Sequence, residues 1–449
     1  MERWSENIIY YPQLAHPLHN ERGITREKYM ALLKKYAVRY EREDLIDIKL
    51  QVVYKALYGK QEGGKHWDSY SQQIDKEVLR TRFSPFKIFS YRYIFLFDCL
   101  LLFAVTDEEK GKQICDDIKA CVHSRYHKKI DDMVLKMYEG DKRFAIKTLI
   151  SDEMVCAWSD ARQFNESREQ EVVFTATMSA GKSTLINAIM GHNLSETKKA
   201  ACTSTVIKFH SIPVKNNLYT IIDEKHHYFF EDPDYVRDYM KDRKTPFEVC
   251  AYFDSLFCNR KITLTDTPGI DSALNTLHKN VTRSELTGHK EKILYVIPVE
   301  TYGSKADYNY LTYIKKEVSY DKIVFSVNMM DSCDMEDDSI GNILQEIQKH
   351  LEDIGFPNPV VCPVSAKAGL QLKRLLNGAE LSDNERRSAE VFRNLFLKEE
   401  FALAEYYPHI DESEVKDLRS RFSGVCDDEL WKAYVNTGLP GLEKILYDL

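Results

Sequence analysis

The sequence predicts an N-terminal helical domain over residues 1–167 and a doubly wound α/β domain over residues 168–449. Up to about Glu169, glycine and proline are sparse and apolar residues recur at the spacing of one helix face. From Glu171 on, short β-rich runs alternate with helical stretches, which is typical of a doubly wound sheet. A chain of 449 residues also exceeds what one hydrophobic core usually serves, so two domains agree with its length.

Two stretches illustrate the helical part. The face formed by Leu45, Ile48, Val52, Val53 and Ala56 predicts one helix, and residues 130–150 predict another, with breaks near residues 59–64 and 84–85. The longest apolar stretch, residues 94–105, contains Asp98 and falls short of the ~20 residues that a membrane-spanning helix needs. It predicts a buried helix, so any membrane contact would be peripheral.

Composition excludes several classes of function. Apolar residues make up 43% and aromatic residues 12%, as in a folded globular protein. The formal net charge of -8, with both signs mixed along the chain, gives no footprint for nucleic acid. The ten cysteines form no CxxC pair and no apolar signal region follows Met1, so we expect a cytoplasmic protein without disulfides or structural zinc.

The α/β domain is expected to contain six strands and a helical insertion. The strands are predicted at residues 172–175, 206–212, 262–265, 293–299, 322–328 and 360–364, several of them continuously apolar. A polar, helix-rich insertion covers about residues 377–435, where Ser382 and Glu385 make a plausible capping box. A last helix begins after Thr437.

A glycine-lysine-serine turn lies between the first strand and an amphipathic helix. Residues 176–183 fit the phosphate-loop pattern G-x-x-x-x-G-K-[S/T] except that Ala176 replaces the first glycine. Backbone amides at the helix start would hold the α- and β-phosphates, Lys182 would reach the β- and γ-phosphates, and the Ser183 hydroxyl would ligate Mg²⁺. The residues predicted to surround the phosphates are Ala180, Gly181, Lys182, Ser183 and Thr184.

Two later motifs fit the metal and the γ-phosphate. The sequence Asp-Thr-Pro-Gly at residues 266–269 follows a strand, so Asp266 is suited to hold Mg²⁺ through water and Gly269 to offer its amide to the γ-phosphate. Thr203, ahead of the second strand, is the candidate to contact Mg²⁺ and the attacking water, with Thr205 as second choice. The alternative is that these threonines simply enter a β-strand.

Two further motifs select the base. In Asn-Met-Met-Asp at residues 328–331, Asp331 could accept hydrogen bonds from the guanine N1 and N2 groups, while Met329 replaces the usual lysine and predicts weaker nucleotide affinity. Ser-Ala-Lys at residues 365–367 matches the other guanine loop. With Asn328, the residues predicted to contact the base are Asp331, Ser365, Ala366 and Lys367. Their order favours GTP over ATP.

Together these motifs resemble those of bacterial members of the dynamin-like GTPase family, over about residues 165–449. The resemblance implies that Ser179 offsets charge between the β- and γ-phosphates, directly and through a monovalent cation. It implies weak GTP binding and a homodimer across the nucleotide face. It also implies a helical stalk that often meets membrane. Met178 stands where eukaryotic dynamins carry a glutamine that orients water, so the comparison predicts either slower hydrolysis or hydrolysis that uses another group or backbone contacts.

The hypothesis is thus a GTPase with Mg²⁺ as cofactor and GTP or GDP as ligand, in which Ser179, Lys182 and Thr203 act catalytically and Ser183, Thr203 and Asp266 hold the metal. The alternatives are a GTP-binding module with negligible turnover that controls a partner protein, and a membrane-acting machine. Helical material lies mainly before the GTPase domain, which favours a partner that supplies a stalk or effector. His123 and His127 are one helical turn apart, but a solvated helix face explains them better than a metal site.

Overall fold

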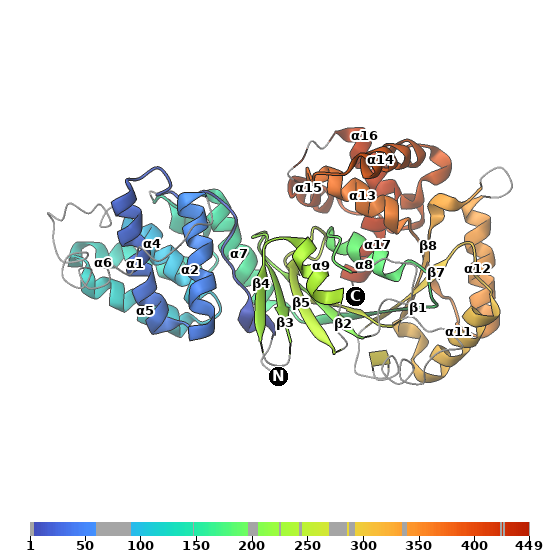
Figure 1. The fold of residues 1–449 in the computed structure, drawn as a ribbon, viewed down its shortest axis with the longest axis horizontal. Coiled ribbons are helices and arrows are strands. Elements are labelled where there is room, and N and C mark those ends of the chain that lie inside the picture. The colour runs from blue at the N-terminus through green and yellow to red at the C-terminus, as the bar shows by residue number, and fades with distance from the viewer. Residues whose placement is uncertain are drawn as a thin grey trace. The chain divides into compact units, whose positions relative to one another are not determined.

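A computed structural model describes residues 4–59, 91–146, 148–195, 205–223, 226–241, 245–268, 285–286, 292–334, 339–422, 424 and 427–448. The chain forms two compact units (Figure 1). The first consists of Met1–Ser167 with Pro213–Asn217, and the second of Arg168–Ile212 with Leu218–Leu449.

The first unit is helical. Its described elements are η1 (Trp4–Asn7), α1 (Gly23–Tyr40), α2 (Glu43–Tyr58), α4 (Arg92–Phe103), α5 (Glu108–Cys121), η4 (Ser124–Tyr126), α6 (His127–Tyr138), η5 (Lys142–Ala145) and α7 (Asp152–Glu166). Helix α2 ends at Gly59, whose φ of 70° is the left-handed conformation that favours glycine. The helix predicted over residues 130–150 is wrong beyond Tyr138, because Gly140 turns the chain with a φ of 76°.

Helix α4 is the buried helix that the apolar stretch predicted. All of its residues except Arg92 are buried, and its one carboxylate, Asp98, is fully enclosed. Asp98 accepts hydrogen bonds from the hydroxyls of Tyr29 at 2.6 Å and Tyr11 at 3.4 Å, and lies 3.0 Å from Nε2 of His16. A buried carboxylate is tolerated only when it is hydrogen-bonded in this way.

The described residues of the second unit form one nine-stranded sheet. Its strands are β1 (Gln170–Ala176), β2 (Ile207–Ile212), β3 (Tyr219–Ile222), β4 (His227–Phe230), β5 (Phe247–Tyr252), β6 (Ile262–Asp266), β7 (Lys292–Pro298), β8 (Ile323–Asn328) and β9 (Val360–Pro363), in the spatial order β4-β3-β5-β2-β6-β1-β7-β8-β9. From β6 to β9 all neighbours are parallel, whereas β2 runs antiparallel to β6, and β3 runs antiparallel to both β4 and β5. The loops after β1, β6, β8 and β9 therefore meet at one edge.

The six predicted strands are present with ends shifted by at most two residues. Three strands were missed, β3, β4 and β5. Strands β3 and β4 have four residues each, and β4 is half-buried rather than apolar, so neither gives a clear periodic signal.

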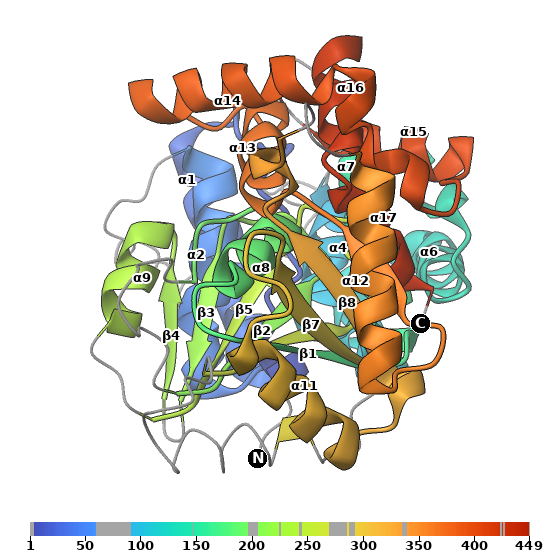
Figure 2. The same cartoon turned by 90° about the vertical axis from the view of Figure 1, so that its right-hand side faces the viewer.

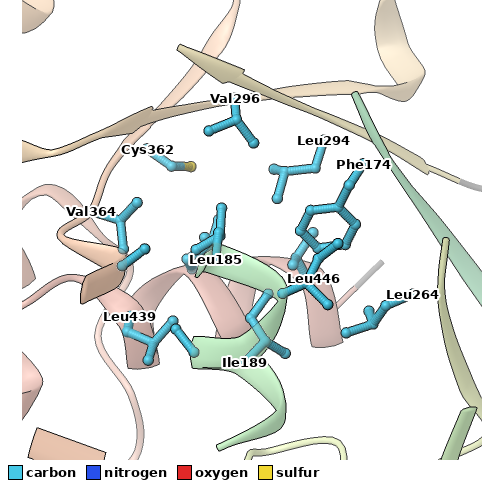
Figure 3. Close-up of a cluster of buried hydrophobic side chains, with 14 of the residues drawn as sticks. Phe174, Leu185, Ile189, Leu264, Leu294, Val296, Cys362, Val364, Leu439 and Leu446 are labelled. Carbon is cyan, nitrogen blue, oxygen red and sulfur yellow. The ribbon is translucent and has the colours of Figure 1, made fainter. Parts of the chain in front are cut away.

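Helices cover both faces of the parallel part of the sheet. Helix α8 (Lys182–Met190) and helix α17 (Leu439–Tyr447) pack on one face, where Leu185 and Leu446 meet Phe174 and Leu294 (Figure 3). Side chains alternate along a strand, so Thr175 projects to the opposite face, where its hydroxyl hydrogen-bonds to Tyr310 of α11 (Lys305–Glu317). This confirms the doubly wound fold class.

The remaining described elements of the second unit are helical (Figure 2). They are α9 (Pro233–Lys241), η6 (Tyr320–Lys322), η7 (Met330–Ser332), α12 (Ile340–Ile354), α13 (Ala366–Leu376), α14 (Asp383–Phe396), η8 (Glu399–Phe401), η9 (Leu403–Tyr406), α15 (Glu412–Ser420) and α16 (Asp428–Asn436). Ser382 and Glu385 form the predicted capping box at the start of α14.

Other sequence predictions can be compared with the described residues. No described helix is long and apolar enough to cross a membrane. His123 and His127 do not share a helix, since His123 caps η4 and His127 begins α6. Within the part of the chain that the structure describes, no group of three or more His, Cys, Asp or Glu side chains could hold a metal ion.

Candidate functional site

The phosphate loop joins the end of β1 to the start of α8. Ala176 is the last residue of β1, and its φ is not positive, so the missing first glycine does not strain the loop. The left-handed conformations fall instead on Ser179, with a φ of 62°, and on Gly181, with a φ of 81°. These two residues turn the chain so that α8 begins at Lys182.

Gly181 is required by space as well as by conformation. A Cβ atom built on it would overlap Nδ2 of Asn328 and would lie 3.4 Å from Cε of Met329. The phosphate loop and the loop after β8 are therefore in direct contact.

Lys182, Ser183 and Asp266 converge at the carboxyl ends of β1 and β6. The ammonium of Lys182 forms an ion pair with Oδ1 of Asp266, and the Ser183 hydroxyl donates a hydrogen bond to Oδ2 at 3.3 Å. Asp266 is fully buried, and Lys182 is 7% exposed. The loops thus bring together the predicted phosphate-binding lysine and both described candidates for the metal.

Burial controls the charge of this lysine. Desolvation lowers the pKa of Lys182 to about 7, because an ammonium loses its hydration inside the protein. The carboxylate of Asp266 beside it opposes this effect and favours the charged form. Phosphate oxygens near Lys182 would favour the ammonium in the same way.

Ser195 is the second hydroxyl that contacts Asp266, and no sequence motif marks it. Its Oγ donates to Oδ2 of Asp266 at 3.0 Å, and the residue is 2% exposed. It lies after the glycine-capped end of α8, outside any motif. Only the contact across 71 residues of sequence identifies it.

Asn328 links the two predicted guanine loops to the predicted phosphate loop. Its Nδ2 donates to the backbone oxygen of Ala180 at 3.1 Å, and its Oδ1 accepts from the backbone nitrogen of Ala366 at 3.0 Å. The side chain is buried at the end of β8. Asn328 thus bridges motifs separated by 148 and 38 residues in sequence.

Asp331 and Ser365 also contact each other. The Ser365 hydroxyl donates to Oδ1 of Asp331 and thereby orients that carboxylate. Between Asn328 and Asp331, Met329 adopts a φ of 67°, which is uncommon for a residue with a side chain. Lys367 is exposed at the start of α13, and its ammonium lies 5.8 Å from the ring centroid of Phe392.

Of the four remaining candidate residues, the structure describes two. Thr203 and Gly269 lie outside the described residues. Thr205 is buried at 7% exposure just before β2. Thr184 is half-buried in the first turn of α8.

The donor set fits a small, hard cation. Mg²⁺ prefers oxygen ligands and keeps several waters, so one hydroxyl and one carboxylate beside a phosphate are sufficient from the protein. Ser183 and Asp266 supply that pair, and their oxygens are already within hydrogen-bond distance. These residues are chemically suited to Mg²⁺.

Comparison with known proteins gives a family for this region. A family model described as "Dynamin family" matches residues 172–329. An uncharacterized protein encoded in the xynA 3' region of Caldicellulosiruptor sp. (strain Rt8B.4) is 28% identical over 260 residues, which are 55% of this chain and 60% of that protein. The chain therefore spans less than two thirds of this relative's length.

Similarity to solved structures is weaker. An oligomerised bacterial dynamin pair, described as sensing and tethering membranes, shares 12% identity at a TM-score of 0.37, covering 88% of this chain and 60% of that one. Era from Aquifex aeolicus, bound to GDP and aluminium fluoride, shares 17% identity at a TM-score of 0.28, covering 51% and 66%. The chain thus has a doubly wound α/β fold with a glycine-lysine-serine turn after β1, and within it residues 172–329 are similar to the dynamin family.

Proposed function

We propose that the second unit binds GTP and GDP with Mg²⁺ and hydrolyses GTP to GDP and phosphate. The observation that carries the proposal is the meeting of four loops at one edge of the sheet, which joins Lys182 and Ser183 to Asp266 and joins Asn328 to the phosphate loop. A parallel sheet with this arrangement binds its ligand at the carboxyl ends of the strands.

Phosphate would bind at the start of α8. Successive backbone amides there carry the partial positive charge of a helix N-terminus, and the Lys182 ammonium adds a full charge. Binding would exchange the carboxylate contact of Lys182 for phosphate oxygens. The lysine stays buried throughout, where its charge acts most strongly.

Ser183 and Asp266 would hold Mg²⁺, which when bound neutralises charge that develops on the phosphate oxygens. Ser179, in the left-handed turn of the loop, would present its hydroxyl and amide to the charge between the β- and γ-phosphates. Thr203 remains our candidate for the attacking water and Gly269 for the γ-phosphate. A monovalent cation beside Ser179 belongs to the same proposal.

Guanine would be selected by Asp331, held in place by Ser365. A carboxylate can accept hydrogen bonds from both N1–H and the N2 amino group of guanine, and adenine has no such pair of donors. Asn328 would keep this loop against the phosphate loop through its two hydrogen bonds. Ser365, Ala366 and Lys367 complete the pocket for the base.

A second candidate is a GTP-binding module with negligible turnover. It is favoured by Met178, a 36% exposed side chain that can orient no water by a strong hydrogen bond, and by Met329 in place of a lysine. In that case the nucleotide state would control assembly with a partner protein.

Single-turnover hydrolysis at saturating GTP and Mg²⁺ separates the two candidates. We expect a rate well above that of the Lys182→Ala variant at matched occupancy. Equal rates would leave binding alone as the function. Titration calorimetry with GTP, GDP and ATP tests the base, and equal affinity for ATP would contradict the role of Asp331.

We infer a homodimer through the nucleotide face, with peripheral membrane contact or a partner protein as the target of the nucleotide cycle. Light scattering with GDP and aluminium fluoride should show a doubling of mass. Co-sedimentation with liposomes tests membrane contact, and failure to bind any lipid mixture would favour the partner protein.

A further inference from the structure

The carboxylate of Asp266 is held on two sides. Its Oδ1 contacts the ammonium of Lys182, while its Oδ2 accepts hydrogen bonds from Ser195 at 3.0 Å and from Ser183 at 3.3 Å. Asp266 is fully buried, so each of these contacts acts without competition from solvent. Lys182 and Ser183 have roles in the proposed function, whereas Ser195 has none.

Ser195 is fixed by a clamp from the phosphate-loop helix. Asn187 of α8 is fully buried, and its Oδ1 accepts from the backbone nitrogens of Leu194 at 3.0 Å and Ser195 at 2.7 Å. Its Nδ2 donates to the backbone oxygen of Ser195 at 2.8 Å and to Oδ1 of Asn193 at 3.1 Å. One amide side chain thus satisfies both backbone groups of Ser195.

This clamp limits where the Ser195 hydroxyl can lie. A serine side chain has one rotatable bond to its oxygen, so fixing the backbone leaves three staggered positions. In one of these positions the oxygen lies within hydrogen-bond distance of Oδ2 of Asp266. The hydroxyl is therefore a preset donor and needs little reorganisation to hold the carboxylate.

A carboxylate that binds a metal is oriented by the groups that hydrogen-bond to it. A hydroxyl that ligates a cation presents its oxygen to the metal, as Ser183 would, whereas a hydroxyl outside the ligand set can keep its hydrogen on the carboxylate. Ser195 is such a hydroxyl: it lies outside the proposed ligand set and donates its hydrogen to Asp266. It fixes the direction of Oδ2 without competing for the metal.

We propose that Ser195 is a positioning residue. Its hydroxyl holds Asp266 in the orientation that binds Mg²⁺. The inference rests on the proposed function and adds to it a residue outside the phosphate-loop and switch motifs. It makes the metal affinity of the site depend on the turn after α8 and on Asn187.

The test is the Mg²⁺ dependence of GDP binding, which can be measured without hydrolysis. The dissociation constant of a fluorescent GDP analogue is determined with Mg²⁺ and with EDTA, and the ratio of the two gives the coupling between metal and nucleotide. Loss of an outer partner of a metal ligand typically costs 10–100-fold in metal affinity. For Ser195→Ala we expect the ratio to fall about tenfold or more, with little change in EDTA.

Ser211→Ala is the matched control. Ser211 lies in β2 and is also fully buried. Its hydroxyl donates a hydrogen bond to the backbone oxygen of Arg260 at 2.6 Å and not to Asp266. We expect it to leave the coupling ratio unchanged. Should Ser195→Ala unfold, Ser195→Cys fills the same space with a weak donor and is expected to lower the ratio likewise.

A second comparison uses Asp266→Asn, which lacks the carboxylate. If Ser195 acts through Asp266, then adding Ser195→Ala to this variant should change the ratio no further.

The possible outcomes separate the two proposals. A wild-type protein that binds no guanine nucleotide in Mg²⁺ would overturn both. A wild-type ratio well above one that persists in Ser195→Ala would overturn only the role of Ser195. Equal loss of affinity with Mg²⁺ and with EDTA would also overturn it, because a residue that only supports the loop weakens both states.

Discussion

At the scale of single residues, two non-glycine residues of the site adopt left-handed backbone conformations. Ser179 has a φ of 62° and Met329 has a φ of 67°. Such a conformation costs roughly 1–2 kcal/mol for a residue with a Cβ atom. Strain of this kind is common at ligand sites, where the surrounding structure maintains it. Both residues flank Gly181, so the strain is concentrated where the phosphate and guanine loops meet.

The role of Ser179 can be separated from its strain with two variants. Ser179→Gly relieves the backbone and removes the hydroxyl, while Ser179→Ala removes only the hydroxyl. We expect the glycine variant to be more stable than the alanine variant by about 1 kcal/mol in urea unfolding. Both should lose GTP turnover, by about 100-fold, as when a donor to developing charge is removed. Full turnover in Ser179→Gly would rule out a catalytic hydroxyl.

Asp331 gives the test of base selection. Asparagine at this position offers a donor in place of one acceptor, which suits the C2 oxygen of xanthine rather than the amino group of guanine. Asp331→Asn should lose about 10–100-fold in GDP affinity, as for a lost bidentate contact to a base, and should gain affinity for XDP. Asp334→Asn, at an exposed position three residues later, is the control and should bind GDP as the wild type does. Calorimetry with both nucleotides checks this.

At the scale of elements, a buried ion pair ties together three helices of the second unit. The ammonium of Lys373 in α13 lies 2.7 Å from Oε1 of Glu443 in α17 and donates to the backbone oxygen of Ile189 in α8 at 3.0 Å. Both charged side chains are fully buried, and burial raises the pKa of Glu443. The phosphate-loop helix, the guanine-loop helix and the last helix thus share one polar contact.

Removing one partner of this pair should be costly. Lys373→Met leaves the carboxylate of Glu443 buried without its cation, and we expect a loss of about 3–5 kcal/mol in the free energy of unfolding. The double variant Lys373→Met/Glu443→Leu should recover much of that loss, because two apolar side chains need no desolvation. Denaturant titration measures both.

A surface pair provides the control. Arg393 lies 2.7 Å from Glu429, with side-chain exposures of 33% and 70%. Glu429→Gln should cost no more than about 1 kcal/mol, since solvent screens exposed ions. If Lys373→Met costs no more than this control, the buried pair is not an important tie.

At the scale of the whole molecule, the chain contributes a short loop from its α/β part to the helical unit. Pro213–Asn217, between β2 and β3, belongs to the first unit. The side chain of Asn216 donates to the backbone oxygen of Ile9 at 2.6 Å, and Gln13 donates its backbone N–H to the oxygen of Lys215 at 3.2 Å. The boundary between the two units therefore does not fall at a single position in the sequence.

Nucleotide should stabilise the protein as a whole. A ligand at 100 times its dissociation constant adds about 2.7 kcal/mol to the folded state, which corresponds to a rise of roughly 5–10 °C for a unit of this size. We expect GDP with Mg²⁺ to raise the melting temperature in this range in scanning calorimetry. ATP should leave it unchanged, and so should GDP with Lys182→Ala. A rise with ATP equal to that with GDP would contradict guanine selection.

The sequence by itself determined the fold class, and its motifs predicted a phosphate loop and two guanine loops. These are local patterns: a strand, a turn with Gly181 and an amphipathic helix follow one another within some twenty residues, and strand runs such as residues 323–328 are mostly apolar. It did not predict β3, β4 or β5; β3 and β4 have only four residues each and give no clear period.

Only the tertiary structure decided which distant residues meet. Ser195 reaches Asp266, Asn328 bridges Ala180 and Ala366, and Lys373 finds Glu443 through contacts across tens to more than a hundred residues of sequence. No local pattern encodes such pairs, because they depend on strand order and on the packing of helices against the sheet. The motifs therefore predict which residue types the proposed site contains, while the fold sets the orientation of Asp266.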